Sequence, residues 1–503
     1  MIHSVRVGGQ EADGSLFDTF AALARDEIVS FPALRPHQRM PVHAFFVQIA
    51  ALALHRAGRT ELPEDEASWR ELLLALTPEW PGGEAWELTV ADWSKPALLQ
   101  PPVTTAAAIA EHKPRALTPD ALDMLVTSKN HDIKAERLAD REDVWLFALI
   151  TVQTAAGVLG AGKYGISRMN GGYGSRVFMS IRPPGHLGAA FRRDVRELLN
   201  SRAEIIHRHP DLADDGLGLV WTRPWGDGPL PYAGLDPFYV EICRRVRLIQ
   251  GQDGIVGHTA GSKTSRIEAK ALNGRTGDPW APLDAGGDKS WGIGDGAFGY
   301  RKVAVLLDRA QVTPPPLAAL TSRDALDGIG LRLTAVRGGQ GKTEGFHDRI
   351  IPIARRVPQS RGPGKVLDAL AEAAQDRAVK AGEVGRILRH AIFALHRRGS
   401  EAIDLSDKAI APKVAPWMDA FDRSVDAVFF GEGFQDQAAK IEAPHAVIWT
   451  DELASMARET FTVAAASSSL GVSKRMRAQA EGRTLLERRL RSYLSQFKEA
   501  ADV

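Results

Sequence analysis

The stretch GLRLTAVRGGQGKTEGFHDRIIPI, residues 330–353, decides between two kinds of fold because its centre has the composition of a phosphate-binding loop. A P-loop requires a glycine five positions before its Gly-Lys pair and a helix directly after it. Val336 occupies that glycine position, and Gly345 and Pro352 follow where the helix would have to form. Before the glycines, apolar and polar residues alternate with the period of a strand. The stretch therefore predicts two strands joined by a glycine-rich loop, and a simple surface hairpin stays open as its role.

The composition is that of an ordinary globular protein, with 44% hydrophobic and 25% charged residues over 503 positions, which favours two or three domains. The net charge is only +1, so contact with nucleic acid would have to come from local patches. The single cysteine, Cys243, excludes a disulfide framework and a cysteine-based zinc site, and its apolar neighbours predict an inert buried thiol. The absence of a basic leader and of a long apolar run predicts a cytoplasmic protein that does not cross a membrane.

The pattern of apolar and polar residues changes near RGPGK, residues 361–365. Upstream, short apolar runs separated by glycine, proline and aspartate predict a large, irregular α+β domain over residues 1–362, with an apolar helix at 42–58. Downstream, four stretches carry apolar residues at three-to-four spacing and have short connections between them. This pattern predicts an antiparallel four-helix bundle over residues 363–503.

Histidine and aspartate pairs raise the alternative of a metal-dependent nuclease or phosphohydrolase. His131 and Asp132 resemble the pair of HD-type phosphohydrolases, but no upstream histidine and downstream aspartate on helices complete the ligand set. The segment HRHPDLADD, residues 207–215, has two histidines and three aspartates, but its proline favours a solvated loop. The sequence therefore predicts a protein without catalytic residues, metal or cofactor.

Two further loops have the residue types that contact phosphates. GAGKYGISRMNGGYGSR, residues 160–176, combines six glycines with Lys163, Arg168 and Arg176. Glycines permit close approach of the backbone, and cations neutralise phosphate oxygens. The polar loop TSKNHDIKAERLADR, residues 127–141, precedes an apolar helix. Each loop is equally well explained as an ordinary connection, so both interpretations stay open.

These three loops in this order resemble CasA, the large subunit of the type I-E CRISPR surveillance complex Cascade, as do LRPHQRMPVHAFFVQIAALAL (34–54), LDPFYVEICRRVRL (235–248) and the C-terminal helices. The resemblance spans nearly the whole chain. It implies a non-catalytic subunit that assembles with crRNA-containing Cascade subunits and reads the protospacer-adjacent motif of target double-stranded DNA. It also implies roles in strand opening, in R-loop formation and in recruiting a helicase-nuclease, while guide pairing supplies sequence recognition.

The resemblance assigns site residues by position. RGGQG matches the family hairpin in which a glutamine wedges into the duplex, which selects Gly339, Gln340, Gly341 and Lys342. GAGKYG matches the family glycine loop, which approaches the backbone of the motif and selects Gly160, Gly162, Lys163 and Gly165. The polar loop falls where the family anchors the subunit near the crRNA 5′ end, which selects Lys129, Asn130, His131 and Lys134.

Family members also place a lysine in the minor groove, but the segment GSKTSRIEAK, residues 261–270, aligns poorly. The resemblance therefore leaves three candidates, Lys263, Arg266 and Lys289.

The last helix adds cations including Arg475 and Arg489, which the resemblance assigns to displaced or flanking DNA; pairing with Glu481 and Glu487 is the alternative. Two departures from the family matter. Gly339 stands where relatives often have a polar residue, which points to broader or different motif specificity. The cysteine cluster of some relatives is missing, so zinc is not expected.

Overall fold

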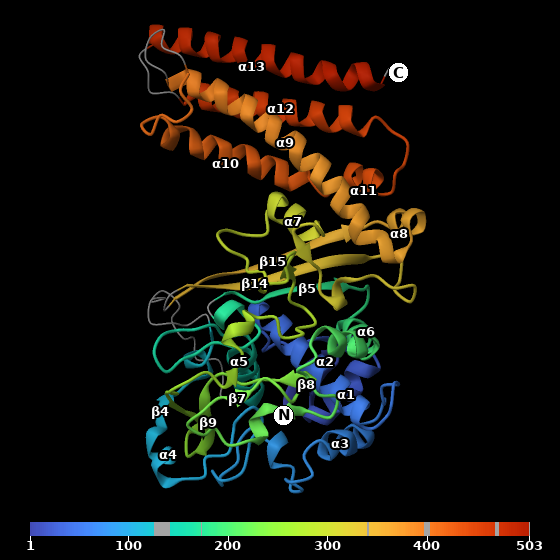
Figure 1. Cartoon of the computed structure of the whole chain (residues 1–503), viewed down its shortest axis with the longest axis vertical. Helices are drawn as coiled ribbons and strands as arrows, with labels where there is room; N and C mark the ends of the chain where they lie inside the picture. Colours follow the sequence, from blue (N-terminus) through green and yellow to red (C-terminus); the bar gives the residue numbers. More distant parts are fainter. Residues whose placement is uncertain (125–140, 173, 340–341, 397–402, 468–471, 502–503) are drawn as a thin grey trace. The chain divides into compact units, whose positions relative to one another are not determined.

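The computed structural model describes residues 1–124, 141–172, 174–339, 342–396, 403–467 and 472–501 (Figure 1). The chain forms two compact units. The first consists of Met1–Ala297 and Ala310–Ile351, and the second of Phe298–Arg309 and Pro352–Val503. The segment around 300 therefore belongs with the C-terminal helices, whereas the sequence-based division at 362 places it in the first domain. The predicted α+β class is confirmed.

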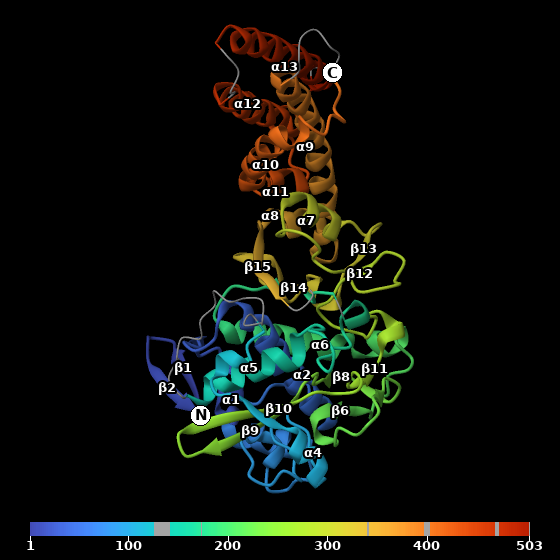
Figure 2. The same ribbon diagram turned by 90° about the vertical axis from the view of Figure 1, so that its left-hand side faces the viewer.

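The helices of the first unit include one that is apolar and largely buried. They are α1 (Leu16–Ala24), α2 (Arg39–Arg56), α3 (Glu66–Ala75), α4 (Ala106–Glu111), α5 (Glu142–Ala155) and α6 (Leu187–Arg208). Helix α2, predicted at 42–58, is buried on most of its circumference, as expected for a helix that is apolar all round. It contacts α5, α6 and a strand at its sides, and Gly58 follows its end with a φ of +63° (Figure 2).

Capping side chains mark the first turn of two neighbouring helices. The Ser15 hydroxyl accepts a hydrogen bond from the Asp18 N–H at the start of α1, and the Asp65 carboxylate accepts one from the Ser68 N–H at the start of α3. Each side chain satisfies a donor that the first helical turn leaves free. The two helices then pack together through Phe20 and other core residues.

The strands form small, separate sheets instead of one large sheet. They are β1 (Ile2–Arg6), β2 (Glu11–Gly14), β3 (Ile28–Ser30), β4 (Lys113–Ala116), β5 (Val177–Arg182), β6 (Leu217–Leu219), β7 (Leu230–Pro231), β8 (Leu235–Val240), β9 (Arg245–Gly251), β10 (Gly254–Ala260), β11 (Ile267–Glu268), β12 (Leu283–Asp284), β13 (Val312–Thr313), β14 (Ile329–Gly339) and β15 (Lys342–Ile353). The strand orders include β2-β1-β3, β4-β10-β9 and β15-β14-β5. Long loops between these sheets carry the candidate site.

The core of the first unit is rich in aromatic rings. Phe20 stacks on Trp69 with ring centroids 5.0 Å apart and meets Phe46 of α2 edge to face at 5.4 Å. Such pairs add to the free energy gained by burying their area. Trp145 of α5 and Trp221 are also fully buried in this core.

The second unit consists of α7 (Tyr300–Leu307), α8 (Arg356–Arg361), α9 (Val366–His396), α10 (Ala411–Val428), α11 (Glu432–Ala438), α12 (His445–Ala466) and α13 (Val472–Ala501). Helix α9 packs against α10, α12 and α13, which confirms the predicted helical bundle (Figure 1). Gly482 permits the close approach of α13, because a Cβ there would lie 3.0 Å from the Ala391 carbonyl oxygen and 2.9 Å from the Phe461 ring. Inside the bundle, Arg377 stacks 3.7 Å from the centre of the Trp449 ring.

No helix in the described ranges is long and apolar enough to cross a membrane.

Candidate nucleic-acid interface

The predicted strand, glycine loop and strand form a hairpin of β14 and β15, whose sheet is completed by β5. Antiparallel pairing sets Leu331 opposite Ile181 and Ala335 opposite Val177. A strand follows the glycines where a P-loop would need a helix, so the structure excludes that motif. The residues of the tip, Gln340 and Gly341, lie outside the described residues, as do the side chains of their neighbours.

Hydrogen bonds tie the strand ends beside the hairpin tip to segments that border both other loops predicted from the sequence. The Gly338 N–H donates to the Ser175 hydroxyl over 3.0 Å, which holds the end of the glycine segment beside β14. The Thr343 hydroxyl donates to the Met124 carbonyl oxygen over 2.5 Å, three residues before the polar loop begins at residue 127. The structure therefore brings the roots of the three loops together, although the polar loop itself, with Lys129, Asn130, His131 and Lys134, is not among the described residues.

The glycine loop is a tight turn with an exposed apex. The Lys163 N–H donates to the Gly160 carbonyl oxygen over 3.1 Å, and both Gly160 and Gly162 have positive φ, +122° and +76°. The Ser262 N–H donates to the Gly162 carbonyl oxygen over 3.1 Å, so one side of the turn rests on the chain at Ser262. Ala161 and Lys163 are exposed.

The glycines of this loop serve different purposes. A Cβ at Gly160 would meet no atom within 4 Å, so this backbone faces open space. A Cβ at Gly162 would lie 3.3 Å from the Gly261 Cα, and one at Gly165 would lie 2.3 Å from the Gly172 carbonyl oxygen. The last two glycines are therefore required by packing within the protein, and a substitution there would test folding more than binding.

The structure corrects the interpretation of Arg168 and Arg176, which the sequence suggested as cations available to phosphates. Both side chains are only 2% exposed. Arg176 forms a bidentate salt bridge with Asp278, with N–O distances of 2.8 and 2.9 Å. Arg168 lies 3.7 Å from Glu241 and 4.0 Å from Asp278, and it stacks over the Tyr239 ring. These guanidiniums fasten the glycine segment to the core and do not reach solvent.

The two carboxylates of this cluster have opposite electrostatic character. Burial raises the pKa of the Glu241 carboxyl, and the facing Arg168 only partly offsets that effect. Burial also opposes ionisation of Asp278, but Arg176 and Arg168 outweigh it and hold the Asp278 pKa below its ordinary value. Asp278 is therefore the carboxylate whose charged form the two buried arginines favour.

The three candidates for the groove-binding cation have different environments. Lys263 is exposed and pairs with Asp227 over 2.9 Å. Lys289 is exposed on the turn after β12. Arg266 is buried, with hydrogen bonds to the carbonyl oxygens of Pro224, Val220 and Arg223, and burial lowers its pKa to about 10. Arg266 is therefore a structural residue, and its selection as a DNA contact is corrected.

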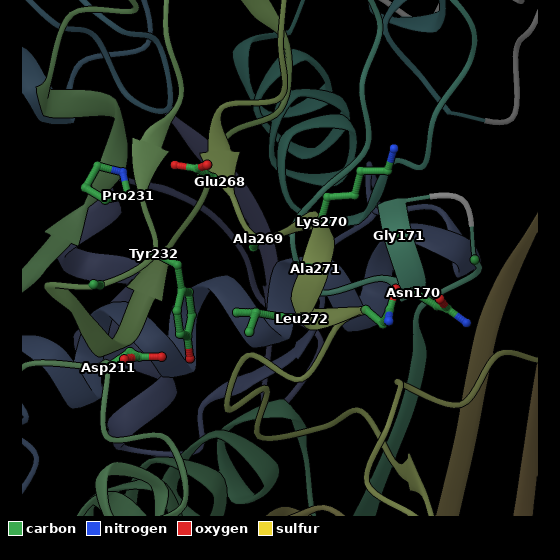
Figure 3. A pocket seen from close by; sticks show the side chains of 13 residues that line it. Asn170, Gly171, Asp211, Pro231, Tyr232, Glu268, Ala269, Lys270, Ala271 and Leu272 are labelled. Atoms are coloured by element: carbon green, nitrogen blue, oxygen red, sulfur yellow. The ribbon is translucent and has the colours of Figure 1, made fainter.

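Lys270 is a cation that the sequence analysis missed, although it ends the segment 261–270 that contains two of the candidates, Lys263 and Arg266. It begins a short 3-10 helix (Lys270–Leu272) that contacts the one at Asn170–Gly172 in the glycine segment. A shallow hollow of about 1070 Å3 lies between them. Figure 3 shows the Lys270 side chain extending away from Tyr232 and Asp211, and no ion pair of Lys270 occurs within the described part of the chain.

In the second unit, α13 carries several cations. Arg489 is exposed and Arg475 is half-buried, and the exposed set also includes Arg477, Arg483, Arg488 and Arg491. Glu487, one of the two acids considered as their partners, instead pairs with Arg458 of α12 over 2.9 and 3.1 Å. Among the described residues, these α13 arginines have no ion pair.

The residues considered for catalysis do not form a site in the described ranges. His207 lies in α6, which extends to Arg208 and replaces the first part of the predicted loop, and Asp214 pairs with Arg202 over 2.8 Å. No group of three or more His, Cys, Asp and Glu residues within those ranges could hold a metal ion. Burial raises the pKa of Cys243 to about 11, which confirms the buried thiol. His131 and Asp132 lie outside the described residues.

Comparison with solved structures shows the same fold over nearly the whole chain. The crystal structure of CasA from Thermus thermophilus has a TM-score of 0.64 and 16% identity, with 98% of each chain covered. The crystal structure of Cse1 from Acidimicrobium ferrooxidans has a TM-score of 0.62 and 16% identity, covering 99% of this chain and 97% of the other. No family model and no curated protein matches. The chain therefore has a CasA-like fold, and the resemblance seen in the sequence is confirmed at that level.

The buried cluster gives a test of how the glycine segment is held. Asp278→Asn should lower the free energy of unfolding by about 3–5 kcal/mol, because it leaves two buried guanidiniums without their anion. Glu241→Gln should lower it less, since burial already favours the neutral form of Glu241. Because the Asp278 pKa is lowered on folding, its contribution is complete above the ordinary carboxyl pKa and is lost as the pH falls through the lowered value. Urea unfolding at several pH values measures all three effects. Equal losses of unfolding free energy in Asp278→Asn and Glu241→Gln would contradict the assignment of Asp278 as the main partner of the two arginines.

Proposed function

We propose that this chain is the large subunit of a crRNA-guided Cascade complex of type I-E, in which it recognises the motif beside the target and helps to open the duplex. The observation that carries the proposal is the CasA-like fold over 98% of the chain. The hydrogen bonds of Gly338 to Ser175 and of Thr343 to Met124 support it, because they hold the strands beside the Gln340 loop against segments that border the other two predicted loops. The chain contributes no catalytic residue in this proposal; a recruited helicase-nuclease degrades the DNA.

The exposed turn at Gly160–Lys163 is proposed to contact the DNA backbone. Gly160 and Ala161 leave the backbone open to an approaching phosphate, and Lys163 supplies a charge with no ion pair within the described part of the chain. Such contacts set position and affinity without reading sequence. Lys270, which lies across the adjoining hollow, is proposed as the groove-binding lysine in place of Arg266, with Lys263 and Lys289 as the other exposed candidates.

Ala161 offers a test of this contact that avoids the strained glycines. Ala161→Glu should weaken binding of the assembled complex to target duplex roughly tenfold, because a carboxylate would oppose the phosphates. Ala161→Gln is the matched neutral control and should bind nearly as the wild type does. Lys163→Ala should lower the slope of log K against log salt by about one. Identical affinities for the Glu and Gln variants across a salt series would mean that the loop is only a turn.

The hairpin tip is proposed to be a wedge, with Gln340 as its inserted side chain. An amide on a narrow hairpin suits the minor groove, which is about 6 Å wide and offers few distinguishing groups. Separating one base step costs a few kcal/mol, which guide pairing then offsets. Gly339, Gly341 and Lys342 would flank the insertion, and the polar loop with Lys129, Asn130, His131 and Lys134 would lie at the crRNA end.

Gln340→Ala should slow R-loop formation on a linear duplex while leaving assembly with the RNA-bound subunits intact, because the phosphate contacts lie elsewhere. A target already melted beside the motif should restore the rate, since the unstacking step has been completed. Time-resolved R-loop assays on duplex and bubble targets measure both. An equal defect on the two targets would mean that Gln340 contributes only affinity, and no defect on either would reduce the hairpin to a surface feature.

Arg475 and Arg489 of α13, which lie on one face of the helix, are proposed to hold displaced or flanking DNA. Arg475→Glu together with Arg489→Glu should shorten the lifetime of the R-loop at moderate salt without changing the subunit composition of the complex. The pair Arg458→Ala and Glu487→Ala removes a neighbouring ion pair and serves as a control for the stability of the bundle. An unchanged R-loop lifetime after charge reversal would contradict this role of Arg475 and Arg489.

A further inference from the structure

A cleft in the first unit combines an apolar floor with a cationic rim. It has a volume of about 360 Å3 and lies among α2, α6, β3 and the face of the β5-β14-β15 sheet. Its floor includes the buried rings of Phe31, Phe46 and Phe191 and the side chain of Met40. From Arg332 in its wall to Gly338 is roughly 20 Å along β14, at the rise of a β-strand. The cleft is therefore separate from the end of β14 that leads to the proposed wedge.

Most charges in the wall are already balanced. Arg332 bonds Asp348 across the hairpin, with N–O distances of 3.0 and 2.7 Å. Asp194 accepts a hydrogen bond from His43 over 2.8 Å and pairs with Arg193 over 2.9 Å. A further cation approaching the cleft would find no free carboxylate in this wall.

Two cations at the rim differ from these. Arg39, at the start of α2, and Arg182, at the end of β5, are exposed and line the cleft. Neither guanidinium has an ion pair within the described ranges. The cleft thus presents two unbalanced positive charges beside an aromatic floor, and its complement is an apolar group with a carboxylate next to it.

The residues at the rim also indicate which class of molecule the cleft binds. Val29 is 39% exposed and Ile350 is 41% exposed, and both border the cleft. Apolar rim residues around a pocket suited to one large side chain are typical of a protein contact, where a single anchor contributes much of the affinity. The volume lies near the lower limit of about 300 Å3 for small-molecule sites.

We propose that this cleft binds a segment of a partner protein in which an aromatic or large aliphatic side chain is flanked by acidic residues. The apolar side chain rests on Phe31, Phe46 and Phe191, and the acidic residues pair with Arg39 and Arg182. The inference does not depend on the proposed DNA role of the hairpin or the glycine loop.

Methyl NMR of the full chain tests the proposal directly, because Met40 and Ile350 supply reporters in the floor and at the rim. The probe is the peptide Ac-Glu-Phe-Asp-NH2, for which a dissociation constant of roughly 1 mM is expected of a single anchored side chain. Both methyl signals should shift and saturate. Replacing phenylalanine by alanine, or both acids by their amides, should weaken binding about fivefold or more.

Variants separate the rim from general electrostatics. Arg39→Ala and Arg182→Ala should each weaken binding of the probe severalfold, and Arg59→Ala, which removes an exposed arginine away from the cleft, should leave it unchanged. Failure of the acidic peptide to saturate either signal, or equal binding of the amide peptide, would overturn the proposal. Equally tight binding of 3-phenylpropanoate would also overturn it, in favour of a small-molecule site.

Discussion

The bidentate salt bridge between Arg176 and Asp278 is the contact on which the arrangement of the candidate interface depends. Arg176 ends the glycine segment and stands one residue before β5, and Asp278 lies about a hundred residues later in the chain. Their bond, supported by Arg168 and Glu241, fixes where β5 begins. Because β5 pairs with β14, the same bond sets the position of the hairpin relative to the glycine turn. A buried charge cluster therefore lies below the exposed glycine loop. It fixes the ends of that loop and leaves its apex accessible.

Much of the architecture could be predicted from the sequence because it rests on local signals. The apolar helix at α2, the strand, loop and strand of the hairpin, and the helices of the second unit all follow from residue periodicity and glycine positions. The burial of Cys243 also follows from its neighbours. Strand pairing was not predictable in this way, since β5 meets β14 across about 150 residues, and only tertiary packing decides such a partner.

The cations of the candidate site show where the sequence was insufficient. Arg168 and Arg176 stand among glycines and polar residues, which is typical of an exposed loop, yet both are buried because Asp278 and Glu241 fold over them from distant segments. Arg266 is likewise held by carbonyl oxygens from the segment around 220–224. Whether an arginine faces solvent depends on partners that no local pattern identifies. Lys270 could have been found only by asking which lysine lies beside the glycine segment in space.

The central claim is that this chain works as part of an RNA-guided complex, and the RNA bound to it in the cell tests that claim most directly. The measurement is purification of the tagged chain from its host under native conditions, followed by sequencing of the RNA that remains bound. The account predicts a discrete population of short RNAs with a constant repeat-derived end and variable guide sequences. Purification with no RNA, or only with random fragments of abundant transcripts, while the chain is folded and stable, would contradict it.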